Sequence, residues 1–171
     1  MKPIFIIAGE KGSGKTSFLL QLINLLETKR RIVAGFVSAH DLKSDIYSIK
    51  NIQTHQKVNL MERVDSFHQR PHHFKLFTNA VEVGNNWINT LLKTPPHIGI
   101  IDEIGSYELM EELWAKSFTQ LIKSPLPIIF TCKKKHLKAI LEKWNIEPKA
   151  VFYPHDFNDP LKAFKQIDGL W

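Results

Sequence analysis

The stretch that determines the fold of this chain lies at residues 9–16 and reads Gly9-Glu10-Lys11-Gly12-Ser13-Gly14-Lys15-Thr16. An apolar run over 4–8 precedes it, and an apolar run typical of a helix follows it over 17–26. Strand, glycine-rich loop and helix in this order are the context in which G-x-x-x-x-G-K-[ST] forms a P-loop, whose backbone amides hold phosphate oxygens. The sequence therefore predicts a polyphosphate site at the start of the first helix.

The residue types in this loop follow from that chemistry. Glycines let the backbone approach phosphate closely, and the helix beginning near Lys15 adds unpaired N–H groups and a partial positive charge. Lys15 is expected to reach the β- and γ-phosphates, and the Thr16 hydroxyl is expected to ligate Mg²⁺. The residues predicted to bind the nucleotide are Gly9, Glu10, Lys11, Gly12, Ser13, Gly14, Lys15, Thr16 and Ser17.

Length and composition narrow the class of protein. The 171 residues fit one domain over 1–171, and 43% of them are hydrophobic, which is enough for a core. No apolar run approaches the roughly 20 residues of a membrane span, and we expect no secretory leader before the first strand. Cys132 is the only cysteine, which excludes an internal disulfide and fits a reducing compartment. We expect a cytoplasmic protein without a membrane partner.

The basic balance of the chain has two interpretations. The net charge is +6, but the basic residues are scattered apart from Lys133-Lys134-Lys135. Scattered charge favours a solvated surface around a polyphosphate site, and nucleic-acid binding is the less favoured alternative.

The pattern of apolar residues predicts an α/β fold. Strands are expected over 4–8, 31–38, 97–103, 127–132 and 150–153, and helices over 17–26, 80–92, 107–122, 136–144 and 160–167. This alternation implies a mainly parallel sheet with helices on both faces, a three-layer arrangement. Short, partly alternating stretches predict an excursion of antiparallel hairpins at about residues 45–77, after the second strand.

Two acids end the third parallel strand, where the metal-binding acid of a P-loop protein belongs. Asp102 is predicted to hold Mg²⁺ opposite Thr16. Glu103 follows directly, and at a strand end the backbone can turn both carboxylates toward the ligand. A carboxylate just beyond the metal acid can orient a water molecule toward the γ-phosphorus. We therefore predict Lys15 and Glu103 as the catalytic residues of a hydrolysis reaction.

The cation that would stabilise the transition state is less evident. The only arginines are Arg30, Arg31, Arg63 and Arg70, and none follows a predicted parallel strand directly. Arg63 and Arg70 lie in the hairpin excursion and could fold over the phosphates. The lysines at 133–135 follow the fourth apolar strand at the right edge of the sheet, so one of them is another candidate. Tyr153-Pro154-His155, after the last strand, is a candidate contact for the base.

With both motifs identified, the chain resembles the THEP-type nucleoside-triphosphatases, also called cancer-related nucleoside-triphosphatases. The resemblance rests on the P-loop, on Gly35-Phe36, and on Ile101-Asp102-Glu103-Ile104-Gly105 followed by Glu108-Leu109. It implies a RecA-like P-loop fold and slow Mg²⁺-dependent hydrolysis of nucleoside triphosphates with broad base tolerance. It also implies the metal role for Asp102 and the catalytic carboxylate role for Glu103. Ser106-Tyr107 departs from the family's usual pattern and marks a divergent member.

Three classes of function fit the motifs. A stand-alone nucleoside-triphosphatase acting on ATP or GTP is favoured, because Glu103 favours water as the acceptor of the phosphoryl group. A P-loop kinase for a small molecule is the first alternative, although the sequence has no arginine-rich lid. A nucleotide-binding accessory protein with incidental hydrolysis is the second, although no guanine-binding Asn/Thr-Lys-x-Asp motif is present.

Overall fold

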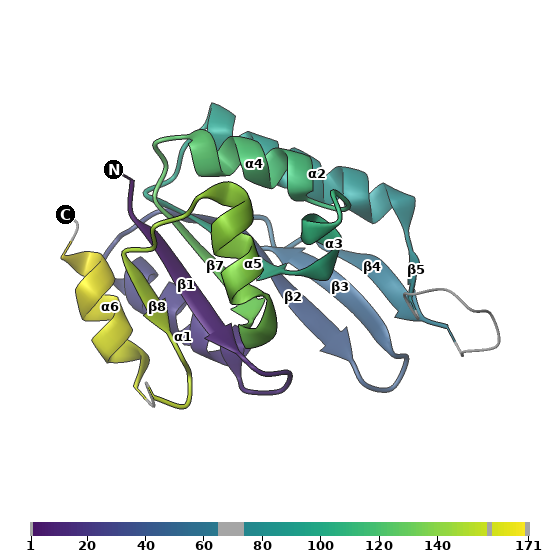
Figure 1. Ribbon diagram of the computed structural model, residues 1–171, viewed down its shortest axis with the longest axis horizontal. Coiled ribbons are helices and arrows are strands. Elements are labelled where there is room, and N and C mark those ends of the chain that lie inside the picture. The colour runs from purple at the N-terminus through teal and green to yellow at the C-terminus, as the bar shows by residue number, and fades with distance from the viewer. Residues whose placement is uncertain (1, 65–73, 157–158, 170–171) are drawn as a thin grey trace.

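An eight-stranded sheet with the strand order β5-β4-β3-β2-β6-β7-β1-β8 forms the centre of the protein (Figure 1). The computed structural model describes residues 2–64, 74–156 and 159–169. The strands are β1 (Ile4–Gly9), β2 (Val33–Asp41), β3 (Ile46–Asn51), β4 (Lys57–Arg63), β5 (Phe74–Leu76), β6 (Ile98–Ile104), β7 (Ile128–Lys133) and β8 (Ala150–Phe152). The five strands β2, β6, β7, β1 and β8 run parallel, as the apolar runs predicted.

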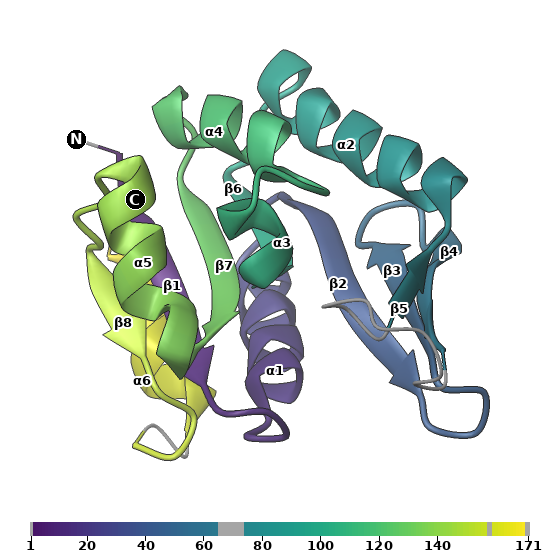
Figure 2. The same cartoon turned by 45° about the vertical axis from the view of Figure 1, so that its right-hand side comes forward.

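Helices cover both faces of this sheet, which confirms the three-layer α/β prediction. They are α1 (Lys15–Thr28), α2 (Thr78–Lys93), α3 (Ser106–Leu109), α4 (Ala115–Lys123), α5 (Lys134–Trp144) and α6 (Pro160–Asp168). Helices α1 and α6 pack together on one face, and α2, α3, α4 and α5 lie on the other (Figures 1 and 2).

The side chains of each buried strand point alternately to the two faces of the sheet, and apolar residues occupy both sets of positions. In β1, Phe5 and Ile7 contribute to the core under α1 and α6, whereas Ile4 and Ile6 contribute to the core on the opposite face. Successive strand side chains point to opposite faces, so a continuous apolar run is what a strand with helices on both sides requires.

Over residues 46–63 and 74–76, the predicted hairpin excursion is present as an antiparallel extension of the same sheet, and residues 65–73 of the predicted range lie outside the described residues. Strand β3 pairs with β2, β4 pairs with β3, and β5 pairs with β4, all antiparallel. The register shifts between Tyr47 and Ser48, where a bulge bends the ribbon. Figure 2 shows these strands as a wing that extends beyond β2, on the side away from β7.

The prediction of a single helix over residues 107–122 was wrong. The chain instead forms α3 and α4, separated by a turn in which Glu111 and Leu113 have φ values of 64° and 46°. This break brings Trp114 into the core, where it is 1% exposed and its ring centroid lies 5.3 Å from that of Phe36. The space comes partly from Gly84 of α2, where a Cβ atom would lie 2.3 Å from the Trp114 ring. Burial of one large aromatic side chain thus outweighs the continuity of the helix.

The strand order decides which motifs become neighbours. Strand β7 lies between β1, which leads into the P-loop, and β6, which carries Asp102 and Glu103. Parallel pairing then brings the carboxyl ends of all three strands to one edge of the sheet.

Among the described helices, none is long and apolar enough to span a membrane.

Gly35 in β2 is expected to tolerate no larger residue. Its φ is 123°, and a Cβ atom would lie 1.9 Å from the Ile100 carbonyl oxygen of the paired strand β6. We predict that Gly35→Ala lowers the free energy of unfolding by about 2 kcal/mol or more. Gly169→Ala, where the nearest atom would be 3.5 Å away, is the matched control. Urea denaturation measures both, and equal stability of the two variants would contradict this account.

Candidate active site

The P-loop has the geometry that its sequence predicted. Gly12 and Gly14 have φ values of 75° and 83°, conformations that favour glycine, and α1 begins immediately afterwards at Lys15. The Lys15 side chain is 5% exposed and folds back over the loop, where Nζ donates a hydrogen bond to the Glu10 carbonyl oxygen at 3.0 Å. A buried ammonium group therefore lies directly beside the loop amides.

Asp102 joins the P-loop helix to the central strands. Its carboxylate is 1% exposed, and Oδ2 accepts hydrogen bonds from the Thr16 hydroxyl at 3.0 Å and from the Ser38 amide at 2.9 Å. The Thr131 hydroxyl donates to Oδ1 at 2.6 Å. The structure thus brings together the two residues predicted to hold the metal, Thr16 and Asp102. Ser38 and the hydroxyl of Thr131 complete the arrangement, and neither residue is among the site residues predicted from the sequence.

Glu103 faces the same site because the strand is irregular at this point. Its φ is 67°, and the pairing of β6 with β7 shifts between Ile101 and Ile104. This local bulge turns Glu103 to the same side as Asp102, and Oε1 lies 3.8 Å from Lys15 Nζ. Consecutive residues of a regular strand would point to opposite faces. The structure therefore places both predicted catalytic residues, Lys15 and Glu103, side by side.

The electrostatic environment of Glu103 suits a base. Desolvation and then the charge of Asp102 raise the pKa of the Glu103 carboxyl above its ordinary value, and Lys15 and Lys133 oppose this shift. The side chain is still 41% exposed. A partly accessible carboxylate with a raised pKa can take a proton from a molecule that enters from solvent and accepts the phosphoryl group.

Glu108 is a further buried acid at the site. It is 1% exposed, and its Oε2 accepts a hydrogen bond from the Gly105 amide at 2.8 Å, which caps the short helix α3. Burial raises the pKa of the Glu108 carboxyl to about 7. The Gly-x-x-Glu spacing is the signal that could have identified the cap from the sequence.

The candidate cations fall into different environments. Lys133 and Arg63 line the same cavity as Glu103, but the Arg63 guanidinium lies 3.2 Å from Asp45 Oδ2. Lys134 Nζ instead lies over the Tyr153 ring, 5.8 Å from its centroid. Arg70 lies outside the described residues. Lys133 is therefore the cation that the structure brings nearest to the predicted role.

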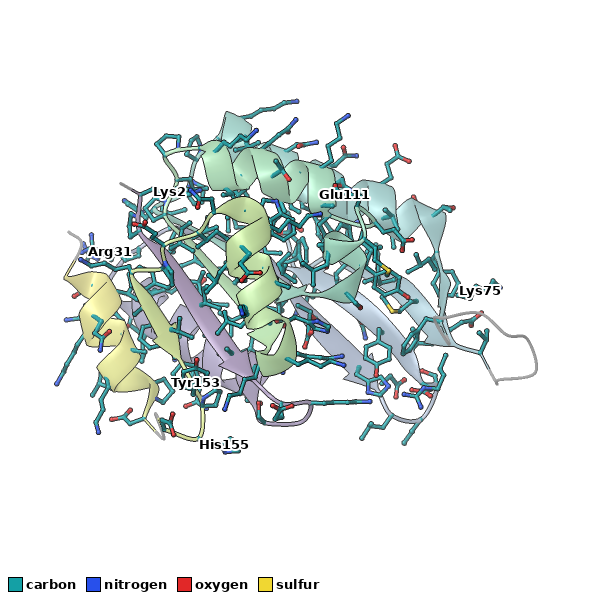
Figure 3. All side chains as sticks on the ribbon, viewed as in Figure 1. Lys2, Arg31, Lys75, Glu111, Tyr153 and His155 are labelled. Carbon is teal, nitrogen blue, oxygen red and sulfur yellow. The ribbon has the colours of Figure 1, made fainter. Side chains whose placement is uncertain are left out.

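The last strand ends away from the acids. Tyr153 and His155 follow β8, and Figure 3 shows both beyond the lower end of that strand, on the side opposite to Lys75 of β5. Since β1 lies between β8 and β7, these side chains flank the P-loop on the side away from Asp102. The predicted base contact at residues 153–155 stays a prediction.

The oxygen atoms at Thr16 and Asp102 fit a magnesium ion. Mg²⁺ prefers oxygen ligands and is usually held by one or two protein groups together with phosphate oxygens and water. A hydroxyl and a carboxylate 3.0 Å apart at the start of α1 provide such a pair. Among the described residues there is no cluster of three or more His, Cys, Asp or Glu side chains that could hold a metal ion.

This geometry defines a P-loop nucleotide-binding protein in which one strand, β7, separates the strand before the phosphate loop from the strand that carries Asp102. A family model described as NTPase matches residues 4–157. The chain belongs to this family and is a nucleoside-triphosphatase. No curated protein matches it.

Two solved structures share the fold. One is the crystal structure of THEP1 from the hyperthermophile Aquifex aeolicus, with 18% identity and a TM-score of 0.70 over 94% of this chain and 95% of that one. The other is the solution structure of a human cancer-related nucleoside triphosphatase, with 17% identity and a TM-score of 0.66 over 90% of this chain and 88% of that one. The family match and these two folds confirm the resemblance to the THEP-type nucleoside-triphosphatases.

Thr131 is expected to hold both acids in place. Its hydroxyl donates to Asp102 and accepts from the Glu103 amide at 2.8 Å, so Thr131→Val would leave a buried carboxylate oxygen and an amide unpaired. We predict that this variant is about 1–3 kcal/mol less stable than wild type in urea denaturation. Thr131→Ser keeps the hydroxyl and is the control. Equal loss of stability in both variants would contradict a specific role for the hydroxyl.

Cys132 is expected to be unreactive in the folded protein. The side chain is fully buried, and burial raises the pKa of its thiol to about 12. The thiolate is the reactive form, so it is scarce at neutral pH. We predict that iodoacetamide modifies Cys132 only after denaturation, as followed by intact mass. Rapid modification of native protein at pH 7 would contradict the packing described here.

Proposed function

We propose that the protein binds a nucleoside triphosphate with Mg²⁺ at the P-loop and hydrolyses it slowly to a nucleoside diphosphate and phosphate. The observation that carries this proposal is the contact between Lys15 and Glu103 beside the Thr16–Asp102 pair. A phosphate-binding cation, a metal-binding pair and a candidate base thus meet within one small volume. Family membership supports the class of reaction, and the geometry supports these residues for it.

The loop and its helix hold the phosphates. The amides of residues 9–17 and the first turn of α1 bind the phosphate oxygens, and Lys15 neutralises charge on the β- and γ-phosphates. Thr16 and Asp102 hold Mg²⁺, which when bound withdraws charge from the phosphate oxygens. In this role Lys15 exchanges its hydrogen bond with the Glu10 carbonyl for one with a phosphate oxygen.

Glu103 completes the reaction by orienting the attacking water. Its carboxylate accepts a hydrogen bond from that water, holds it in line with the γ-phosphorus and takes up its proton. The bond from water oxygen to phosphorus forms as the bond from the γ-phosphorus to the bridging oxygen breaks. Lys133, which faces the same cavity, is placed to stabilise the charge that develops.

Broad base tolerance, which the resemblance to the THEP-type nucleoside-triphosphatases implies, is part of this proposal. All of the contacts named above are to phosphates, metal or water, and none of them reads the base. We therefore expect ATP, GTP and the other common nucleoside triphosphates to be hydrolysed at similar rates. The cytoplasm, which the single buried thiol suits, is the proposed compartment.

Glu103→Gln tests whether this carboxylate is needed for hydrolysis but not for nucleotide binding. The amide keeps the shape of the side chain but cannot take a proton. We predict that the variant binds nucleotide as tightly as wild type and loses about 10²–10⁴-fold in the rate of phosphate release. Phosphate release from each nucleoside triphosphate with Mg²⁺ measures the rate, and isothermal titration with a non-hydrolysable ATP analogue measures binding.

Glu147→Gln removes an exposed acid between α5 and β8 and is the matched control. It should release phosphate at the wild-type rate. Equal rates in wild type and Glu103→Gln would refute the role of this carboxylate. No release by wild type with any nucleoside triphosphate would refute the hydrolysis itself.

A further inference from the structure

A cavity of about 580 Å³ opens beside the proposed γ-phosphate position. Thr16, Asp102 and Glu103 form one end of it, and from there it extends between the wing of antiparallel strands and α3. A water molecule occupies only about 30 Å³ of liquid, so hydrolysis does not require a space of this size. The volume lies instead in the range of small-molecule sites, roughly 300–1,000 Å³.

The wall far from the acids is apolar and largely buried. Ile49, Leu60, Met61 and Trp114 are at most 9% exposed and line the cavity from β3, β4 and the turn before α4. Tyr47 and Phe74 add an aromatic corner in which the two rings meet edge to face, with centroids 5.4 Å apart. Aromatic and methionine side chains of this kind favour a flat apolar body.

One buried polar group in the cavity wall has spare hydrogen-bonding capacity. Oε2 of Glu108 caps α3, and Oε1 makes no hydrogen bond of ordinary geometry, although the backbone amide of Trp114 acts on the same carboxyl and lowers its pKa. A carboxylate can accept about four hydrogen bonds, so a ligand that donates one would find an available acceptor here. The cavity is thus apolar on one side, and on the other it carries the acceptors Glu108 and Glu103 together with the cations Lys11 and Lys133.

The cavity lies on the γ-phosphate side of the loop. Its lining includes Lys11 and Thr16 but not Gly12, Ser13 or Gly14. Because the loop amides hold the α- and β-phosphates, the nucleoside attached to the α-phosphate lies away from Glu103. A molecule in the cavity would therefore approach the γ-phosphorus from the side where the attacking water is expected.

We propose that this cavity binds a small alcohol with an aromatic body, and that its hydroxyl takes the γ-phosphoryl group in place of water. The hydroxyl oxygen forms a bond to the γ-phosphorus while the bond from that phosphorus to the bridging oxygen breaks. Glu103 takes the hydroxyl proton and later releases it to solvent. The products are a phosphate monoester and a nucleoside diphosphate. This inference rests on the proposed function, since it uses the same nucleotide site and the same base.

Benzyl alcohol and 2-aminobenzyl alcohol are suitable probes, because the second adds a donor for Glu108. Saturation-transfer NMR with the full chain, Mg²⁺ and a non-hydrolysable ATP analogue measures binding. Phosphorus NMR with ATP detects the phosphate monoester. We expect both probes to bind and to yield monoester with wild type.

Met61→Trp fills the cavity and should reduce the ratio of monoester to phosphate about tenfold or more. Leu161→Trp adds the same residue on the exposed side of α6, across the sheet, and should leave the ratio unchanged. Glu108→Gln retains an acceptor for the Gly105 amide. This variant should weaken the binding of 2-aminobenzyl alcohol more than the binding of benzyl alcohol. It therefore tests the cavity without enlarging any side chain.

The outcomes separate this inference from the proposed function. Failure of both probes to bind, or binding that neither Met61→Trp nor Glu108→Gln changes, would overturn it. So would binding that yields no monoester while ATP alone is still hydrolysed. Monoester formation without phosphate release from ATP alone would instead support the transfer reaction and refute hydrolysis as the function.

Discussion

The buried carboxylate of Asp102 is the constraint on which the rest of the site depends. A charge that is 1% exposed is stable only if hydrogen bonds replace its lost hydration. Asp102 receives them from Thr16 of α1, Ser38 of β2 and Thr131 of β7. Three elements that are distant in sequence are thereby held to β6 at one point. The position of the phosphate loop relative to the central strands is set by the same contacts that the proposed metal site would use.

The neighbouring bulge shows how the same contacts hold a strained catalytic residue. A positive φ at a residue other than glycine costs of the order of 1–3 kcal/mol, and it persists only where its surroundings stabilise it. At Glu103 that support is the Thr131 hydroxyl, which accepts from the Glu103 amide and donates to Asp102. One threonine therefore fixes the orientation of both acids. The strain is confined to the residue whose side chain must leave the regular strand pattern to reach Lys15.

The features that could be predicted from the sequence are those that depend on local chemistry. The P-loop, the five parallel strands and the two acids follow from spacing and residue type, because glycine, lysine and carboxylate positions there are dictated by phosphate and metal. Tertiary packing decided what the sequence could not show. The helix expected over 107–122 breaks so that Trp114 can pack on Phe36, and the gain appears only once β2 and α2 are in place. The role of Thr131 likewise requires knowing that β7 lies between β1 and β6.

The broken helix and the antiparallel wing act together on one face of the site. If α3 and α4 were continuous, Leu113 and Trp114 would lie on a straight helix and not beside the wing. If the chain returned directly from β2 to α2, Tyr47, Leu60 and Met61 would be missing from the cavity wall. The two departures from a plain alternation of strands and helices therefore create the space next to Glu103. In the transfer reaction proposed above, these added segments determine which molecule attacks the γ-phosphorus. The central strands and the P-loop instead govern binding of the triphosphate.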